Sequence, residues 1–222
     1  MTKGLKLGFV IVIGGIIMTL LSGCDKRNNR EWLENKFGTE LSRVYPTQNV
    51  EDLFKEFPDG FKIDQSYRTG GPHGLLTQMV LVGDSETHSI SGTLNQIDLS
   101  TKDEKETASV VVEYQNGELV FSDEEKAKEI WPFNGFLFQH LTVDKSHLNN
   151  LEMTDKNYNF QNGAFSISYH SQNENINHYL DKKKNKFFTL RLAGSNYKKD
   201  NYYYVLSIKY DEATEFSEII SD

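Results

Sequence analysis

The chain has 222 residues, of which 37% are hydrophobic, 12% aromatic and 25% charged, which is enough apolar material for one core and too many charges for a membrane-embedded body. All 32 acidic residues follow position 24, and the formal net charge of the whole chain is −8. This acidity argues against nonspecific nucleic-acid binding, which needs a basic surface. The single cysteine excludes an intramolecular disulfide and a cysteine zinc cluster.

The first 24 residues have the layout of a secretory leader. Lys3 and Lys6 precede the apolar run 7–21, which carries no charge. The leader ends with four residues that resemble the bacterial lipobox: Leu21, Ser22, Gly23 and Cys24. We therefore expect residues 1–23 to be a signal peptide that is cleaved before Cys24, whose thiol receives an S-diacylglycerol group and whose new amino group receives an N-acyl group such as palmitate.

This lipidation predicts a protein anchored on the extracytoplasmic face of the cell membrane. Two acyl chains at ~0.8 kcal/mol per buried methylene hold the protein there with on the order of 10 kcal/mol each. The alternative is an uncleaved anchor helix, since the apolar run is near the lower limit of about 17 residues for a span. Small residues before Cys24 favour cleavage.

The polar segment 24–30 is expected to be a lipidated flexible tether, and residues 31–222 a single globular domain. Helical spacing of apolar residues predicts a helix over 32–44, stopped by Pro46, and a short helix over 50–57 with Asn49 as its cap. From residue 75 the period changes to alternation, which predicts strands over 75–82 and 89–99.

Asn116-Gly117 between alternating runs predicts a hairpin of strands 109–114 and 118–122. A helix is expected over 122–131, then a second hairpin through Asn162-Gly163, a short helix near 175–180, and strands over 187–193 and 202–210. Seven or eight antiparallel strands with two or three helices predict an α+β fold, in which the helices pack on one face of a twisted antiparallel β-sheet.

The order of these elements resembles the staphylococcal tandem-type lipoproteins over about 200 residues. The segments that carry the resemblance are 21–24, 45–54, 79–81, 110–121, 123–130, 136–140 and 190–210. Residues 66–72 depart from the family, which usually has a lysine- or aspartate-rich turn and Gly-x-Trp there. The resemblance implies a lipid-anchored surface protein linked to host-cell entry and to innate immune stimulation through its lipid, and it implies no enzyme chemistry.

The candidate residues for contact with a protein partner are Lys182, Lys183, Lys184, Lys186 and Tyr203. The four lysines form a concentrated basic run on an acidic chain, suited to an anionic wall polymer, a lipid headgroup or an acidic host protein. A run of this kind is also typical of a solvated turn before a strand. Tyr203 is expected to point to the opposite side of its strand from Tyr202 and Tyr204.

The sequence predicts no catalytic residues, no metal site and no cofactor. The six histidines form no HxH or HxxxH pair, and the closest spacings are His140 to His147 and His170 to His178. No nucleophile elbow or phosphate loop is present, and lipid would consume the only thiol.

Two functions remain in view. The preferred one is a non-catalytic surface protein that contacts a host-cell surface protein; the alternative is an envelope-located lipoprotein that binds a small molecule or wall polymer. A deep apolar pocket would favour the alternative, and a filled core with a patchy surface would favour the interaction protein. The oligomeric state is not indicated.

Overall fold

The structure is a computed structural model that describes residues 26–100, 103–196 and 201–222. Within these residues ten strands form one sheet, in the order β5-β4-β3-β2-β1-β10-β9-β8-β7-β6. The strands are β1 (Phe61–Thr69), β2 (Leu75–Asp84), β3 (Ser89–Asp98), β4 (Lys105–Gln115), β5 (Glu118–Phe121), β6 (Glu152–Tyr158), β7 (Ala164–Ser171), β8 (Phe188–Ser195), β9 (Tyr203–Lys209) and β10 (Glu215–Ser221).

The described helices are short. They are α2 (Arg30–Leu41), α3 (Leu53–Glu56), α4 (Glu124–Ile130), α5 (Lys145–Asn149) and α6 (Glu174–Tyr179), with the 3-10 turns η1 (Lys26–Asn28), η2 (Val50–Asp52), η3 (Gly71–His73) and η4 (Leu137–Gln139). None of them has the length and apolar character needed to span a bilayer.

The predicted fold class is wrong. Instead of a twisted sheet with two or three helices, the described residues form a ten-stranded antiparallel sheet and five α-helices. The main omissions are β1 and β10, which pair with each other at the centre of the sheet. Their alternation is interrupted in the sequence by Gln65 and Glu218, which occupy core positions.

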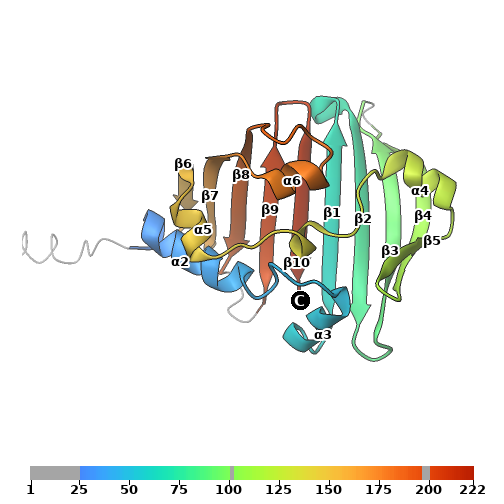
Figure 1. Ribbon diagram of the computed structural model, residues 1–222, viewed down its shortest axis with the longest axis horizontal. Coiled ribbons are helices and arrows are strands. Elements are labelled where there is room, and N and C mark those ends of the chain that lie inside the picture. Colours follow the sequence, from blue (N-terminus) through green and yellow to red (C-terminus); the bar gives the residue numbers. More distant parts are fainter. Residues whose placement is uncertain (1–25, 101–102, 197–200) are drawn as a thin grey trace, which may run out of the picture.

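The core lies between the sheet and the helices, which cover one face of it (Figure 1). Segment 131–143 also runs across this face, from α4 to α5 (Figure 1). Alternate strand residues point into the core; examples are Ile63, Leu81, Leu192 and Leu206, each at most 1% exposed. We call this the inner face of the sheet.

The outer face of the sheet carries a continuous row of polar residues. From β4 to β7 each member of the row is the register partner of the next: Ser109, Asn95, Gln78, Ser66, Ser217, Ser207, Arg191 and Ser168. Within the row, Ser207 and Ser217 share a hydrogen bond of 2.9 Å. Ser168 and Ser207 are buried, whereas other members of the row are partly or fully exposed; one polar face is common for antiparallel sheets.

The predicted hairpins are present. Asn116 and Gly117 have φ values of 53° and 88° and connect β4 to β5, while Gly163 (φ 68°) precedes β7. The predicted tether needs a correction, since residues 26–28 form η1, Asn29 caps α2 by accepting from Trp32 N, and α2 begins at Arg30. The leader and Cys24 lie outside the described residues.

Candidate functional site

Helix α6 and the loop after it form a surface site with two adjoining recesses. Asn173 caps the helix by accepting a hydrogen bond from Ile176 N. Ile176 and Leu180, each 1% exposed, pack into the core and fix the helix on the inner face of the sheet. His178 and Asn175 are left on the solvent side, where both line a cleft.

Asn177 fixes the loop that carries the four lysines. Its side chain is fully buried, and its Nδ2 donates to the carbonyl oxygens of Lys184 (3.0 Å) and Lys186 (2.8 Å). Its Oδ1 accepts from the Tyr210 hydroxyl at 2.7 Å. One amide therefore sets the path of the loop, which is held in place rather than free.

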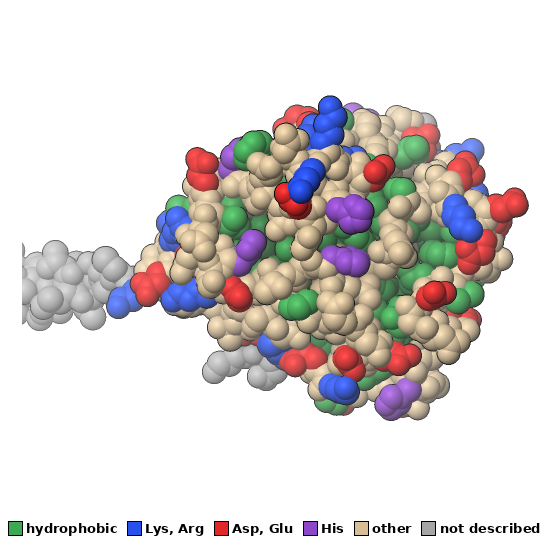
Figure 2. Space-filling model, viewed as in Figure 1, with side chains coloured by type: hydrophobic (Ala, Val, Ile, Leu, Met, Phe, Trp, Pro, Cys, Tyr) green, Lys and Arg blue, Asp and Glu red, His purple; other side chains and the backbone are tan. Residues whose placement is uncertain are grey.

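The cleft between α6 and segment 131–143 has a volume of about 460 Å³ and is open to solvent. Its lining consists of Pro132, Asn134, His140, Asn175, His178, Tyr179 and Asp181. The His140 and Tyr179 rings have centroids 5.7 Å apart, and Asn175 Nδ2 donates to the His140 carbonyl at 3.2 Å. Figure 2 shows histidine side chains close together near the middle of this face.

A second recess continues around α6 toward the lysines. It is lined by Glu174, Asn175, His178, Lys182 and Lys184, with a volume of about 330 Å³. Lys184 pairs with Glu174 at 2.9 Å, and Lys182 Nζ lies 5.9 Å from the centres of two tyrosine rings, Tyr67 and Tyr210.

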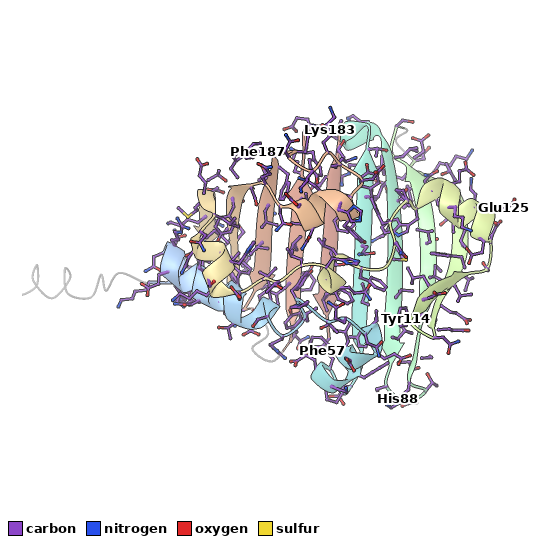
Figure 3. The ribbon with its side chains drawn as sticks, viewed as in Figure 1. Phe57, His88, Tyr114, Glu125, Lys183 and Phe187 are labelled. Atoms are coloured by element: carbon purple, nitrogen blue, oxygen red, sulfur yellow. The ribbon has the colours of Figure 1, made fainter. Side chains whose placement is uncertain are left out.

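The remaining predicted contact residues divide between two faces. Lys183 and Lys186 are exposed, and Figure 3 places Lys183 near Phe187 at one edge of the molecule. Phe187 is 53% exposed. Tyr203 is 46% exposed, whereas its neighbours Tyr202 and Tyr204 are buried. Tyr203 therefore points to the outer face, away from the cleft.

A buried polar network lies beneath the cleft. The Tyr179 hydroxyl accepts from Gln65 Nε2 (2.9 Å) and donates to Gly135 O (3.2 Å). Gln65 Nε2 also donates to Glu218 Oε2 at 2.6 Å. The carboxylate accepts two further bonds, from the Tyr45 hydroxyl at 2.8 Å and from Leu137 N at 3.0 Å.

This network ties segment 131–143 to the centre of the sheet. Glu218 and Gln65 are fully buried, and burial raises the pKa of Glu218 to about 7, against the lowering effect of the hydrogen bonds from Tyr45, Gln65 and backbone N–H groups. Burial also raises the pKa of Tyr45 and of Tyr179 well above the usual range, so both remain neutral donors.

The histidines are grouped differently from the spacings considered in the sequence. His140 and His178 line the same cleft, whereas His147 lies on α5, whose cap is Asp144. His170 stacks on Phe187, with ring centroids 4.8 Å apart. In the described part of the chain, no three side chains among His, Cys, Asp and Glu are placed to hold a metal ion.

The cleft thus offers imidazole and amide groups beside the carboxylate of Asp181. The second recess adds the ammonium groups of Lys182 and Lys184 beside Glu174, so the two recesses together suit hydrogen bonding to a polar partner. The sequence prediction found the lysines but missed the cleft, His140 with His178, and the Gln65–Glu218 pair beneath. The available signal was the alternation Phe61, Ile63, Gln65 and Phe216, Glu218, Ile220, which reads as two strands once a polar residue is accepted in each core position.

Comparisons with known proteins show no family. No protein-family model matches the chain, and no curated protein matches it. Among solved structures, the crystal structure of the Mycobacterium tuberculosis lipoprotein LppX is similar at a TM-score of 0.33 and 8% identity, over 83% of this chain and 93% of that one. This likeness is too low to support an inference about fold or function.

Proposed function

We propose that the chain is an exported, non-catalytic lipoprotein, anchored through Cys24 on the outer face of a Gram-positive cell membrane, that recognises a partner through the surface around α6. We define the α6 surface as the lining of the two recesses together with Lys182, Lys183, Lys184, Lys186 and Phe187. The partner of the preferred function is an acidic protein on a host-cell surface. The sequence resemblance to the staphylococcal tandem-type lipoproteins supports this part of the proposal.

The observation that carries the proposal is the rigid presentation of the α6 surface. Asn177 holds the lysine loop through two backbone carbonyl oxygens, so the backbone that carries Lys183 and Lys186 needs little further ordering on binding, and the entropic cost falls on the side chains alone. Phe187 adds an exposed aromatic ring, a residue type that contributes strongly at protein interfaces. The inner face of the sheet is packed with aliphatic and aromatic side chains, as expected of an interaction protein.

The second candidate is a lipoprotein that binds a small molecule or wall polymer, also without catalysis. The cleft volume of about 460 Å³ favours it, because small-molecule sites commonly occupy about 300–1,000 Å³. The openness and polar lining of the cleft weigh against it, since such sites are mostly apolar and enclose the ligand.

Binding by the mature lipidated protein in vesicles distinguishes the two. Host-surface extract and envelope extract are offered in parallel, and any retained host protein is then purified and titrated. The test variant is Lys183→Ala with Lys186→Ala; the control is Lys55→Ala with Lys128→Ala, two exposed lysines on other elements.

We expect saturable binding of one host protein that weakens about tenfold in the test variant and is unchanged in the control, since rim charges steer association at long range. If only an envelope polymer or solute were retained, and His178→Ala weakened its binding, the second candidate would be favoured instead. Equal binding by test and control variants would remove the lysines from the site.

A further inference from the structure

The end of the domain nearest the leader contains a second basic site. Turn η1 packs against the turn between β6 and β7. Arg27 Nη1 donates to the Tyr158 hydroxyl at 3.0 Å, and its guanidinium group lies 4.8 Å from the centre of the Tyr158 ring and 5.5 Å from that of Phe160. Lys156 Nζ donates to Asn28 O at 2.8 Å. The fold therefore begins three residues after Cys24.

An open recess of about 740 Å³ lies at this place. Its lining is Arg27, Lys36, Tyr158, Phe160, Gln161, Asn162, Gly163 and Asn196, which combines two cations and three amide side chains with no acidic residue in the described lining. Lys36 pairs with Glu40 at 2.8 Å on the next turn of α2. Phe160 is 57% exposed, although its ring lies beside the guanidinium group.

Covalent geometry places this recess next to the lipid. An extended chain spans at most ~3.6 Å per residue, so the Cα atoms of Cys24 and Arg27 lie within about 11 Å of each other. If the acyl chains of Cys24 occupy the hydrocarbon layer, Arg27 lies within reach of the headgroup region, which is roughly 5–7 Å thick in each leaflet. This step rests on the proposed lipid anchor.

We propose that the recess formed by Arg27, Lys36 and the 158–163 turn binds the phosphate group of an anionic phospholipid in the membrane that carries the anchor. Arginine and lysine attract anionic headgroups, side-chain amides donate hydrogen bonds to phosphate oxygens, and an exposed aromatic ring such as that of Phe160 is at home at the membrane interface. The opposite edge of the sheet, β5, then lies roughly 43 Å away across nine strand spacings.

Site-specific fluorescence quenching tests this orientation. Lipidation consumes the thiol of Cys24, the only cysteine of the sequence, so a single added cysteine can be labelled in the mature protein. The test label is at Asn157→Cys, an exposed position of β6 next to Tyr158 and outside the recess lining, and the control label is at Val120→Cys, which is 43% exposed on β5. Both proteins are reconstituted in vesicles of phosphatidylcholine with or without phosphatidylglycerol, containing headgroup-spin-labelled lipid.

We expect strong quenching of the label at residue 157, increased by phosphatidylglycerol, and none at residue 120. Each basic residue near an anionic surface contributes roughly fivefold to binding. Arg27→Gln with Lys36→Gln should therefore reduce the affinity of the recess for phosphatidylglycerol about 25-fold. Lys36→Gln alone, which breaks only a surface ion pair, should reduce it about fivefold and serves if the double variant is misfolded.

Equal quenching at residues 157 and 120, or quenching that changes neither with phosphatidylglycerol nor with the substitutions, would overturn the inference. Mass spectrometry of the mature N-terminus separates this failure from that of the proposed function. An unlipidated residue 24 would contradict the anchor itself, whereas a lipidated protein with an unquenched label at residue 157 would contradict only the headgroup site.

Discussion

Glu218 on β10 is the register partner of Gln65 on β1, and the pair is the polar centre of an otherwise apolar inner face. The side-chain amide of Gln65, the Tyr45 hydroxyl and Leu137 N all donate to the carboxyl group. These donors stabilise the buried carboxyl group in its place, yet desolvation still opposes its ionisation. Glu218 should therefore couple folding to pH.

We predict that the stability of the protein falls as pH rises through the titration of Glu218. The pKa is raised in the folded state from the ordinary 4.5 to about 7, so the folded state holds the proton more tightly than the unfolded chain. The contribution of protonated Glu218 is complete below pH 4.5 and is lost by pH 7 or slightly above. A shift of this size corresponds to about 3 kcal/mol in the free energy of unfolding.

Urea unfolding of wild type and Glu218→Gln between pH 4.5 and 8 measures this effect. Glutamine does not titrate, so the stability of the wild type relative to the variant should decline by about 3 kcal/mol over the range. Glu215→Gln, a substitution on the solvent side of the same strand, should follow the wild-type profile. Parallel profiles for wild type and Glu218→Gln would show that Glu218 does not titrate in this range.

Sequence reasoning could not identify this pair, for a physical reason. Gln65 and Glu218 are 153 residues apart. In its own segment, each is a polar residue that interrupts the alternation of apolar residues expected of a strand. Only the pairing of β1 with β10 supplies the partners that make burial tolerable. The lysines, by contrast, lie close together in the sequence, so a basic site could be predicted from them alone. The structure places two of them, Lys182 and Lys184, beside α6.

At the level of elements, the contact of α2 with α5 depends on a glycine. A Cβ atom added to Gly38 would lie 2.5 Å from Lys145 N and 2.9 Å from Lys145 Cα, both of which are backbone atoms at the start of α5. Asp144 caps that helix by accepting from His147 N at 2.7 Å. The two helices can approach this closely only because residue 38 has no side chain.

We predict that Gly38→Ala destabilises the protein, although alanine has the higher helix propensity. Alanine in an exposed helix gains about 1 kcal/mol over glycine, but here α5 must move, and overpacking typically costs about 1–3 kcal/mol. Thermal unfolding should show a lower Tm, and hydrogen exchange should increase over 145–149. Asn35→Ala, at an exposed position of α2, should leave the Tm unchanged or raise it. A Gly38→Ala protein as stable as wild type would contradict the close packing.

Elements with strong local signals were predictable, and those set by distant contacts were not. The Asn116-Gly117 turn adopts positive φ at both residues, as its sequence requires, and Asn49 caps η2 as expected by accepting from Glu51 N. Helix α5 was missed because five residues carry too little periodicity. The sequence places all of η1 in the predicted tether 24–30, because the partners of Arg27, Tyr158 and Phe160, lie more than 130 residues away.

For the whole molecule, the order of the strands explains why a wide sheet could not be foreseen. β1 and β10 pair although they are the first and last strands in the chain, so the halves β1–β5 and β6–β10 join along a seam that closes only at the end of the sequence. Local alternation predicts the hairpins at Asn116-Gly117 and Asn162-Gly163 but not this seam. Helices on one face and the polar row on the other then leave the two edge strands, β5 and β6, at opposite ends.

The proposed lipid anchor would fix how this wide sheet meets the cell. We predict that Cys24→Ala abolishes the mature, lipid-bearing form, because without the thiol no diacylglycerol is attached and the leader is not removed. Fractionation with mass spectrometry should show wild type in the membrane fraction, lacking residues 1–23 and carrying acyl chains, whereas the variant accumulates as full-length precursor. Lys26→Ala, two residues beyond the cleavage site, should be processed normally. If the variant were membrane-bound at mature size, or if wild type kept its leader, the protein would be held by another means, and the proximity of Arg27 to the headgroups would no longer follow.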